Sequence, residues 1–443
     1  MTTLDHYKKD FADTREKRSH AEPSELLETR EHALNRFLSL GFPTTRDEEW
    51  RFTSVAPIAG HSFALAEAAA NAGHRSLAPV NLSGIAAAEL VFVDGRFAPA
   101  LSSIDALPLG ARLGSLADHL ERRDERTSAH LGRIAPFAAR AFVAFNTAFF
   151  RDGAYIHIAP HTVIEKPIHV VFISSGQTDG RRTAMSHPRV LAVLGENSQA
   201  AIVESYAGPE GRLYLTNVVT EIVLGHNAVL DHYKLQHEST EAYHVGAIFL
   251  KAARSANCAS HSMSLGGSLV RNDVLAVLDG EGGECTLNGL YLADGHRLID
   301  NHTTIDHAMP HCGSREIYKG ILADRARGVF NGKIIVRPDA QKTDAKQTNR
   351  ALLLSEDAQI NSKPELEIFA NDVKCTHGAA VGQLDEDALF YLRSRGLGLS
   401  EARHLLIHAF AGDVLNRMPL VPVRRRVEEL LQRQLADVLA AAA

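Results

Sequence analysis

The chain has 443 residues, of which 45% are hydrophobic and 23% charged, ordinary values for a globular protein with a substantial core. Its formal net charge is −6, from 47 Lys and Arg against 53 Asp and Glu, so it lacks the basic surplus of a nucleic-acid-binding surface. Four cysteines do not make a disulfide framework in so long a chain. The charged N-terminal residues do not resemble a signal peptide, and no apolar run approaches the ~20 residues of a membrane-spanning helix. We therefore expect a cytoplasmic protein that binds neither nucleic acid nor a membrane.

The N-terminal part of the chain has a helical pattern followed by a short β segment. Apolar residues recur at helical spacing after Pro23, and Gly41 ends this pattern. Further along, the string VFVDGRF has the form of two short strands joined by a turn at Asp94-Gly95. We predict an N-terminal helical region with a short β segment over residues 1–150.

The pattern changes near Gly153. From there to about Gly382, short apolar–polar runs follow one another between Gly, Asn, Asp and Ser residues, and the helices of crossover connections are missing. Similar turn-and-strand phrases recur at Gly195-Glu196-Asn197 and Gly225-His226-Asn227. A period of about 27–30 residues is typical of a solenoid. We predict a right-handed parallel β-helix over residues 151–383, with roughly eight coils spaced ~4.8 Å apart.

Three cysteines repeat at a fixed interval. Cys285 lies midway in the sequence between Cys258 and Cys312, so the two intervals are equal and fall within the range of one solenoid coil. If each coil has this length, the three side chains form one column on successive coils. A column of small buried side chains is the usual fate of free cysteines and is the interpretation we favour. A metal-binding or transfer role for the column is left open.

The C-terminal part is again helical. A helix is expected from Asp385 to Arg395, a second from Ser400 to about Met418, and a third with a narrow apolar stripe after Pro422. Three such helices cannot bury their stripes unaided, so we expect them to pack on the end of the solenoid or on a partner. We predict a C-terminal helical domain over residues 384–443.

Motifs of several enzyme classes are missing. The string from Gly328 to Lys333 has the wrong spacing for a nucleotide-binding loop and lacks the hydroxyl residue that would hold magnesium. There is no Cys-x-x-Cys pair, no His-Glu-x-x-His helix and no Gly-x-Ser-x-Gly turn. We therefore name no catalytic residue and expect that any ATPase activity belongs to a partner.

One short segment combines two metal-ligating residue types. Cys375 and His377 are separated by one residue on an extended stretch, so their side chains should share a face. A thiolate with an imidazole suits iron, copper or zinc. Two ligands are too few for a closed site, so another element or another subunit would have to complete it. The alternative is a buried cysteine beside a histidine that caps the solenoid.

Five strings carry a resemblance to a known family. They are KCTHGAAVGQLDEDALFYLRSRGL from Lys374, NHTTIDHAMPHCGSREIYKGIL from Asn301, GKIIVRPDAQKTDAKQTNRALLLSEDAQINSKPELEIFANDVKCTHGA from Gly332, FNTAFFRDGAYIHI from Phe145, and GFPTTRDEEWRFT from Gly41. Together they resemble the SufB/SufD family of the SUF iron–sulfur cluster assembly system, most densely over residues 301–412. Gly378 stands where the SufB branch has Glu, and an N-terminal extension with extra Cys is missing. Both departures favour the SufD branch.

The resemblance implies a β-helix flanked by helical regions and a non-catalytic scaffold subunit. It implies pairing with a SufB-like paralogue and binding of a SufC-like ABC-type ATPase, for which we expect residues 384–443 to be the docking surface. A nascent iron–sulfur cluster would form at the subunit interface, with no cofactor held stably by the isolated chain. The family's functional histidine matches His377, which becomes the candidate iron ligand, with Cys375 a lesser candidate. A homodimer of the isolated chain is left open.

Two alternative functions remain for a chain with a solenoid fold. Many solenoid proteins act on polysaccharides, but such an enzyme needs clustered carboxylates or an arginine in an exposed groove, usually with a secretory signal. The sequence indicates neither, and the C-terminal helices would have no use in such an enzyme. A purely structural adaptor is the other alternative.

Overall fold

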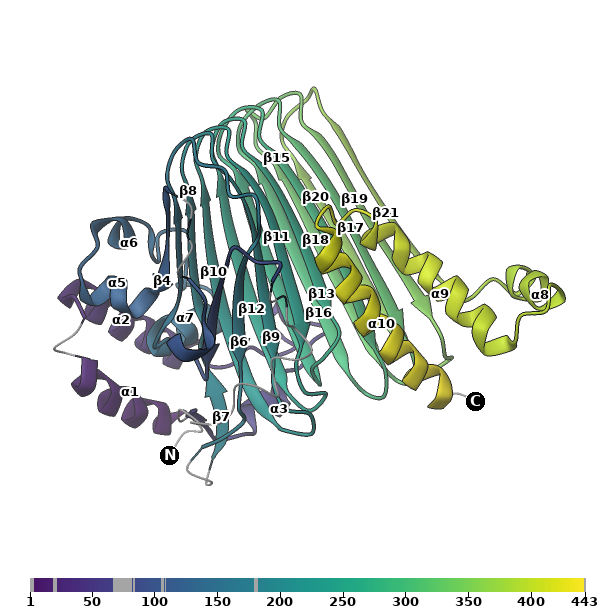
Figure 1. Cartoon of the computed structure of the whole chain (residues 1–443), viewed down its shortest axis with the longest axis horizontal. Helices are drawn as coiled ribbons and strands as arrows, with labels where there is room; N and C mark the ends of the chain where they lie inside the picture. Colours follow the sequence, from purple (N-terminus) through teal and green to yellow (C-terminus); the bar gives the residue numbers. More distant parts are fainter. Residues whose placement is uncertain are drawn as a thin grey trace.

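The computed structural model describes residues 4–18, 22–66, 82, 84–104, 107, 109–178 and 182–441. The fold is mainly β: a β-solenoid of about seven turns forms the core, and helices lie at the N- and C-terminal parts (Figure 1). This confirms the predicted fold class, with slightly fewer turns than expected. Among the described residues, no helix is long and apolar enough to cross a membrane.

Each coil contributes one strand to each of two facing sheets. In the first, sheet A, the main path runs β20-β18-β16-β14-β12-β10-β8-β5-β4, and β1 and β7 pair beside it. All these pairings are parallel except that of β4 with β5. Its strands are β1 (Phe63–Leu65), β4 (Ala111–Ser115), β5 (Gly153–Ile158), β7 (Thr183–Ser186), β8 (Arg189–Leu194), β10 (Tyr214–Leu224), β12 (Tyr243–Ala252), β14 (Leu269–Leu278), β16 (Leu298–His307), β18 (Arg327–Val336) and β20 (Gln359–Ile368).

Sheet B runs β21-β19-β17-β15-β13-β11-β9-β6-β2-β3, and only its last pair, β2 with β3, is antiparallel. That pair turns at Asp94 and Gly95, as predicted from the sequence. Its strands are β2 (Ala88–Val93), β3 (Arg96–Phe97), β6 (Ile168–Ile173), β9 (Gln199–Ala207), β11 (Val229–His237), β13 (Asn257–Ser264), β15 (Glu284–Ala293), β17 (Gly313–Leu322), β19 (Asp344–Leu353) and β21 (Lys374–Gly382).

The length of the coils is not constant, and this corrects the predicted cysteine column. Cys258 pairs with Cys285 on the next coil, but Cys285 pairs with Ser314 and not with Cys312. Cys312 therefore lies just before the column position, in the turn that precedes β17, where its thiol donates to the Gly280 carbonyl at 3.3 Å. All three cysteines are buried in the same core cluster. The spacing between Cys258 and Cys285 equals the length of that coil. The next coil is longer than the spacing between Cys285 and Cys312, so the second pair is out of register.

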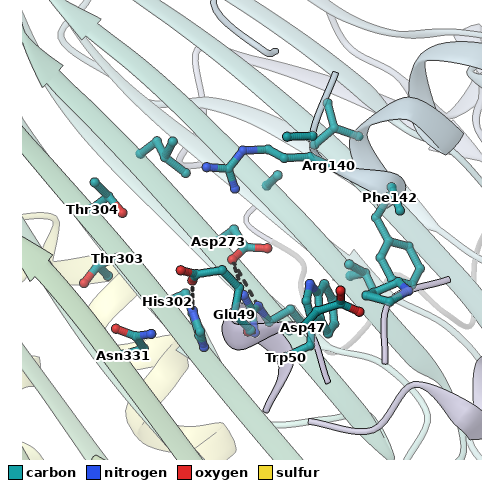
Figure 2. A pocket seen from close by; sticks show the side chains of 18 of the residues that line it. Asp47, Glu49, Trp50, Arg140, Phe142, Asp273, His302, Thr303, Thr304 and Asn331 are labelled. Carbon is teal, nitrogen blue, oxygen red and sulfur yellow. Dashed lines mark hydrogen bonds and ion pairs between the residues drawn. The ribbon is translucent and has the colours of Figure 1, made fainter. Parts of the chain in front are cut away.

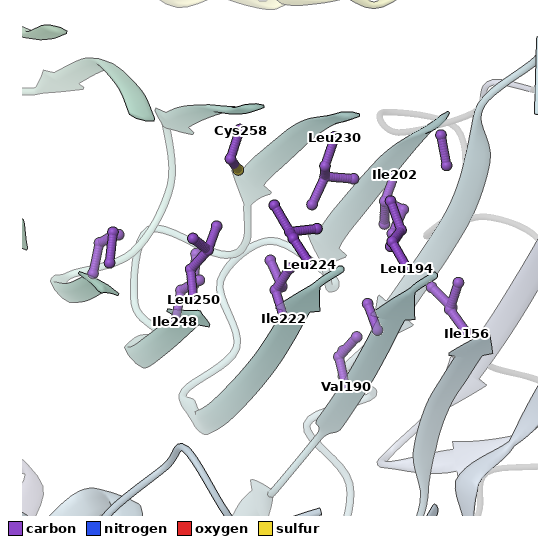
Figure 3. Close-up of a cluster of buried hydrophobic side chains, with 14 of the residues drawn as sticks. Ile156, Val190, Leu194, Ile202, Ile222, Leu224, Leu230, Ile248, Leu250 and Cys258 are labelled. Carbon is purple, nitrogen blue, oxygen red and sulfur yellow. The ribbon is translucent and has the colours of Figure 1, made fainter. Parts of the chain in front are cut away.

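Apolar side chains from both sheets fill the space between them. Figure 3 shows this packing. The side chains drawn there include Ile156, Val190, Leu194, Ile202, Ile222, Leu224, Leu230, Ile248, Leu250 and Cys258. Because side chains alternate along a strand and the pairing is in register, each inward position repeats from coil to coil as a row along the solenoid axis. We call this interior the lumen.

The N-terminal helices pack against the outer face of sheet A. Aromatic residues dominate the contact: Phe37 of α2 stacks on Phe145 of α7 at 4.3 Å between ring centroids, and Met185 and Leu215 of sheet A join the same cluster. The helices of this region are α1 (Asp5–Arg18), α2 (Ser24–Leu40), η1 (Glu48–Trp50), α3 (Ala56–Ala59), η3 (Pro99–Leu101), α5 (Leu116–Glu121), α6 (Glu125–His130) and α7 (Ala141–Phe149). The helix expected after Pro23 is α2.

The C-terminal helices are α8 (Glu386–Ser394), α9 (Leu399–Leu415) and α10 (Val421–Ala441). The apolar stripes of α9 and α10 lie on the outer face of sheet B, where they share one core cluster with Tyr233, Met263 and Leu290. Polar contacts fix them there, because Lys319 donates to the Phe410 carbonyl at 2.8 Å. The stripes are thus covered by the flank of the solenoid and not by its end. Figure 1 shows α8 standing clear of the strands.

Candidate functional site

The predicted site lies on β21, the last strand of sheet B. In the part of the chain that the structure describes, β21 pairs with β19 on one side and has no strand partner on the other. Its residues from Thr376 to Gly382 are all exposed, whereas the inward residues of β19 are buried. The lumen is therefore open to its surroundings at this end.

Cys375 and His377 face the lumen together. They pair in register with Ala345 and Gln347, both of which are buried on the inner face of β19. Since in-register neighbours of a parallel ladder share a face, the two side chains lie on the inner side of β21. The sequence predicted that Cys375 and His377 share a face, and the strand register confirms this. Their chemical role stays a prediction.

The two side chains differ in accessibility. Cys375 is half-buried and packs against an apolar cluster that includes Ile334 and Val336. Burial raises the pKa of its thiol, and the charge of Asp344 acts in the same direction. A protonated thiol is a poor ligand, because the thiolate is the form that binds metal. His377 is exposed. The imidazole is thus the more available ligand.

The remaining cysteines lie deeper in the lumen. Burial raises the pKa of Cys258 well above its usual value and that of Cys285 to about 12, so both are neutral thiols. Among the described residues, no three His, Cys, Asp or Glu side chains gather in a metal-holding group. In this part of the chain, Cys375 and His377 therefore form at most a partial ligand set.

A second concave region lies on the outer face of sheet A, between the strands and the segment that follows α2. It has a volume of about 660 Å³. Figure 2 shows Glu49 and Trp50 of that segment beside Asp273 and His302 of the sheet. The Arg271 guanidinium lies 4.3 Å from the centre of the Trp50 ring and bonds Asp273 at 2.8 Å.

Buried charges tie this segment to the sheet. Arg271 bonds Asp300 at 2.6 Å, and the Thr53 hydroxyl donates to the same carboxylate at 2.5 Å. Burial alone would raise the pKa of Asp300, but the charges of Arg271 and His302 outweigh it and hold the pKa at about 2. A hydrogen bond from His302 likewise holds the pKa of Glu49 at about 2. The cluster joins residues 48–53 to strands β14 and β16, and its internal pairing indicates an anchoring role.

Sequence reasoning missed this cluster, although two of the family-like strings contain parts of it. Glu49 and Trp50 lie in the string from Gly41, and His302 lies in the string from Asn301. Their proximity depends on the packing of the N-terminal segment across sheet A, which no repeat within the solenoid encodes. The coil repeat could have placed Arg271 beside Asp300, since these two are register partners.

Comparison with known families identifies the class of protein. The model of the SUF system FeS cluster assembly SufBD core domain matches residues 172–410, and that of the SufBD protein N-terminal region matches residues 1–170. The chain therefore belongs to the SufBD family, and its general role is iron–sulfur cluster assembly in the SUF system.

Individual relatives agree with this assignment. An iron–sulfur cluster assembly SufBD family protein of Synechocystis is 34% identical over 93% of this chain and 91% of its own length. The iron–sulfur cluster assembly protein SufD of Escherichia coli is 31% identical over 91% of this chain and 90% of its own length. The chloroplastic protein ABCI7 of Arabidopsis thaliana is 30% identical over 90% and 84%. The resemblance stated from the sequence strings is thus confirmed.

Proposed function

We propose that this chain is a scaffold subunit that supplies His377 as one ligand of a nascent iron–sulfur cluster, at a boundary with a SufB-like paralogue. The observation that carries the proposal is the position of His377, which is an exposed imidazole on the open edge of the lumen with too few neighbouring ligands, among the described residues, for a complete site. A neutral imidazole supplies one ligand, and a thiolate of the partner would supply another. The cluster is the cargo of this site, assembled there and passed on.

The open end of the solenoid is the surface proposed for the paralogue. Both sheets end there in full-length strands, β20 and β21, whose outer edges have no partner among the described residues. An uncovered edge strand is a template for pairing with another chain, so natural proteins usually cover or interrupt it. Exposed apolar residues lie at the same end, namely Ile368, Phe369 and Val381. A second solenoid seated on this end would cover them and close the site around His377.

Replacement of His377 tests the ligand role. Because the side chain is exposed, His377→Ala should change the free energy of unfolding by no more than about 0.5 kcal/mol. Cluster formation, followed by absorbance in anaerobic reconstitution with the SufB-like and SufC-like partners, should fall about 10-fold or more. Cys375→Ser should have a smaller effect, since that thiol is half-buried and its pKa is raised.

The matched control is His296→Ala, which removes another exposed histidine from the turn before β16. It should leave cluster formation unchanged. Normal assembly with His377→Ala would refute the ligand role. Loss of folding as the only effect would show that His377 caps the solenoid instead.

We further propose that the SufC-like ATPase docks on α8 and the adjoining start of α9. The stripes of α9 and α10 are covered by sheet B, and the most exposed large apolar side chains that the structure describes on this domain are Phe390, which is 75% exposed, and Tyr391, which is 56% exposed. Large exposed aromatic residues are frequent energetic centres of interfaces. The region of residues 384–443 predicted for docking is thus narrowed to one short helix and its neighbour.

The docking proposal is tested by calorimetry with the intact chain, because deletion of all three helices would uncover sheet B. The double variant Phe390→Ala and Tyr391→Ala should weaken ATPase binding by about 2 kcal/mol or more, a factor of roughly 30. Phe52→Ala is the control, since Phe52 is also exposed but lies on the N-terminal segment. Undiminished affinity of the double variant would refute the assignment.

A further inference from the structure

The rows of inward side chains make direct hydrogen bonds along the solenoid axis. His232 Nδ1 lies 2.9 Å from Ser260 Oγ, one coil further on. Asn272 donates to its register partner Asn301 at 3.0 Å. In-register polar residues of the lumen are therefore close enough to bond from one coil to the next.

The row that ends at His377 contains a third such pair. Glu316, Gln347 and His377 are successive register partners on β17, β19 and β21. The Gln347 side-chain amide donates to Glu316 Oε2 at 2.8 Å. In the structure, the nitrogen of the Gln347 amide faces Glu316. The oxygen of the Gln347 amide therefore points away from Glu316.

That oxygen has no hydrogen-bond partner among the described residues, although Gln347 is only 1% exposed. A buried polar atom without a hydrogen-bond partner costs free energy of folding, and such atoms are uncommon in native proteins. The fold makes room for this side chain, because a Cβ at Gly332 on the facing sheet would lie 2.2 Å from Gln347 Nε2. The group that comes next in the row is the imidazole of His377.

We propose that Gln347 is a positioning residue for His377: its amide oxygen accepts a hydrogen bond from one ring nitrogen of His377 and leaves the other nitrogen's lone pair directed out of the lumen. The imidazole then has one tautomer and one orientation before iron arrives. Metal-binding histidines in proteins nearly always have such an acceptor behind them, and its loss typically lowers metal affinity or activity by about 10- to 100-fold. Glu316 acts one step further back, by holding the amide of Gln347.

The role of this hydrogen bond in cluster assembly rests on the function proposed above. Whether the hydrogen bond between Gln347 and His377 forms does not depend on that function. It can therefore be measured on the isolated, full-length chain without iron. Nitrogen-15 NMR distinguishes a protonated from an unprotonated ring nitrogen, and the His377 signals are assigned by their loss in His377→Ala. In alkaline buffer, the wild type should show a single tautomer.

Gln347→Met, which keeps the length of the side chain and removes the acceptor, should lose that preference and show the mixture of tautomers of a free imidazole. The control is Asn349→Leu, which removes another buried amide from the same inner face of β19, opposite Ala379 and not His377. It should leave the His377 signals unchanged. Retention of the single tautomer in Gln347→Met would overturn the inference.

A mixed tautomer in the wild type would overturn it as well, and that measurement does not depend on whether a variant folds. Failure of the proposed function has a different signature. Normal cluster assembly by His377→Ala would remove the ligand role, whereas the tautomer result would still decide whether Gln347 bonds the imidazole.

Discussion

The two ends of the solenoid are built in opposite ways. At the N-terminal end, each sheet finishes with an antiparallel strand, β4 in sheet A and β3 in sheet B. Apolar residues of the same segments close the lumen, with Phe92 and Leu113 inside the core cluster and Phe97 packed against it. At the C-terminal end, both sheets stop at full-length parallel strands whose residues are half-buried or exposed.

The side chains that line the lumen also differ between the two ends. The coils nearest the closed end are lined by aliphatic and aromatic residues, whereas polar inward residues begin at Glu204 on β9 and continue through His232 to Glu316, Gln347 and Asn349 near β21. An apolar closed end stabilises the isolated chain. A polar open end contributes less to stability and leaves hydrogen-bonding groups available. This contrast supports the proposal that the open end contacts a partner, while the closed end contributes more to folding.

The largest loss of stability is expected from a substitution at the closed end. Phe92 is 0% exposed and its ring lies 5.1 Å from that of Phe172, so Phe92→Ala should lower the free energy of unfolding by about 3–5 kcal/mol through lost burial and a cavity. Phe369→Ala removes the same side chain at the open end, where it is 62% exposed, and should cost no more than about 0.5 kcal/mol. Urea denaturation measures both. Similar losses for the two variants would contradict the difference between the ends.

The pH dependence of stability tests whether Glu316 is held protonated inside the lumen. Burial raises its pKa from the usual 4.5 to about 7. Between these values the folded chain keeps a proton that the unfolded chain releases, so stability is greatest below this window and falls as the pH rises through it. Glu316→Gln cannot ionise and should be more stable than the wild type at pH ~8, by on the order of 3 kcal/mol, and equally stable at pH ~4.5.

Urea denaturation at the two pH values provides the measurement. The control is Glu367→Gln on β20, whose side chain is 44% exposed, and it should show no comparable gain at the higher pH. A stability difference between Glu316→Gln and the wild type that does not change with pH would show that the carboxyl group is not held protonated by burial.

The smallest effect is expected at α8, the helix that stands clear of the solenoid. The Asp385 side chain caps this helix by accepting from the backbone amides of Asp387 at 2.9 Å and Ala388 at 3.1 Å. Asp385→Ala should lower the local stability of α8 by about 1 kcal/mol and speed amide hydrogen exchange there about fivefold, with the solenoid unaffected. Glu386→Ala, which removes a first-turn carboxylate that makes no cap, should do less. Faster exchange throughout sheet B in the Asp385 variant would contradict a local effect.

The parts of the fold that follow from local pattern were predictable. Strand alternation indicated the β-helix, the Asp94-Gly95 turn indicated the β2–β3 hairpin, and helical spacing after Pro23 indicated α2. The buried helix α7 was missed because it is apolar on nearly every side, and periodicity detects only helices with two unlike faces.

The site was predictable only in part. The alternation of side chains along a strand placed Cys375 and His377 on one face, as the register of β21 with β19 confirms. The sequence could not show that Gln347 lies behind His377, because the coils have unequal lengths and no fixed period aligns them. The equal spacing of the three cysteines misplaced Cys312 for the same reason.

The covering of sheet B by α9 and α10 has a consequence for biosynthesis. Each coil contacts mainly its neighbours, so the solenoid can grow coil by coil as the chain leaves the ribosome, starting from the closed end. Tyr233, Met263 and Leu290, however, are covered by helices encoded after residue 398. Throughout the synthesis of the solenoid this apolar flank faces water, and the emerging chain is most prone to aggregation or chaperone capture just before its last helices are made.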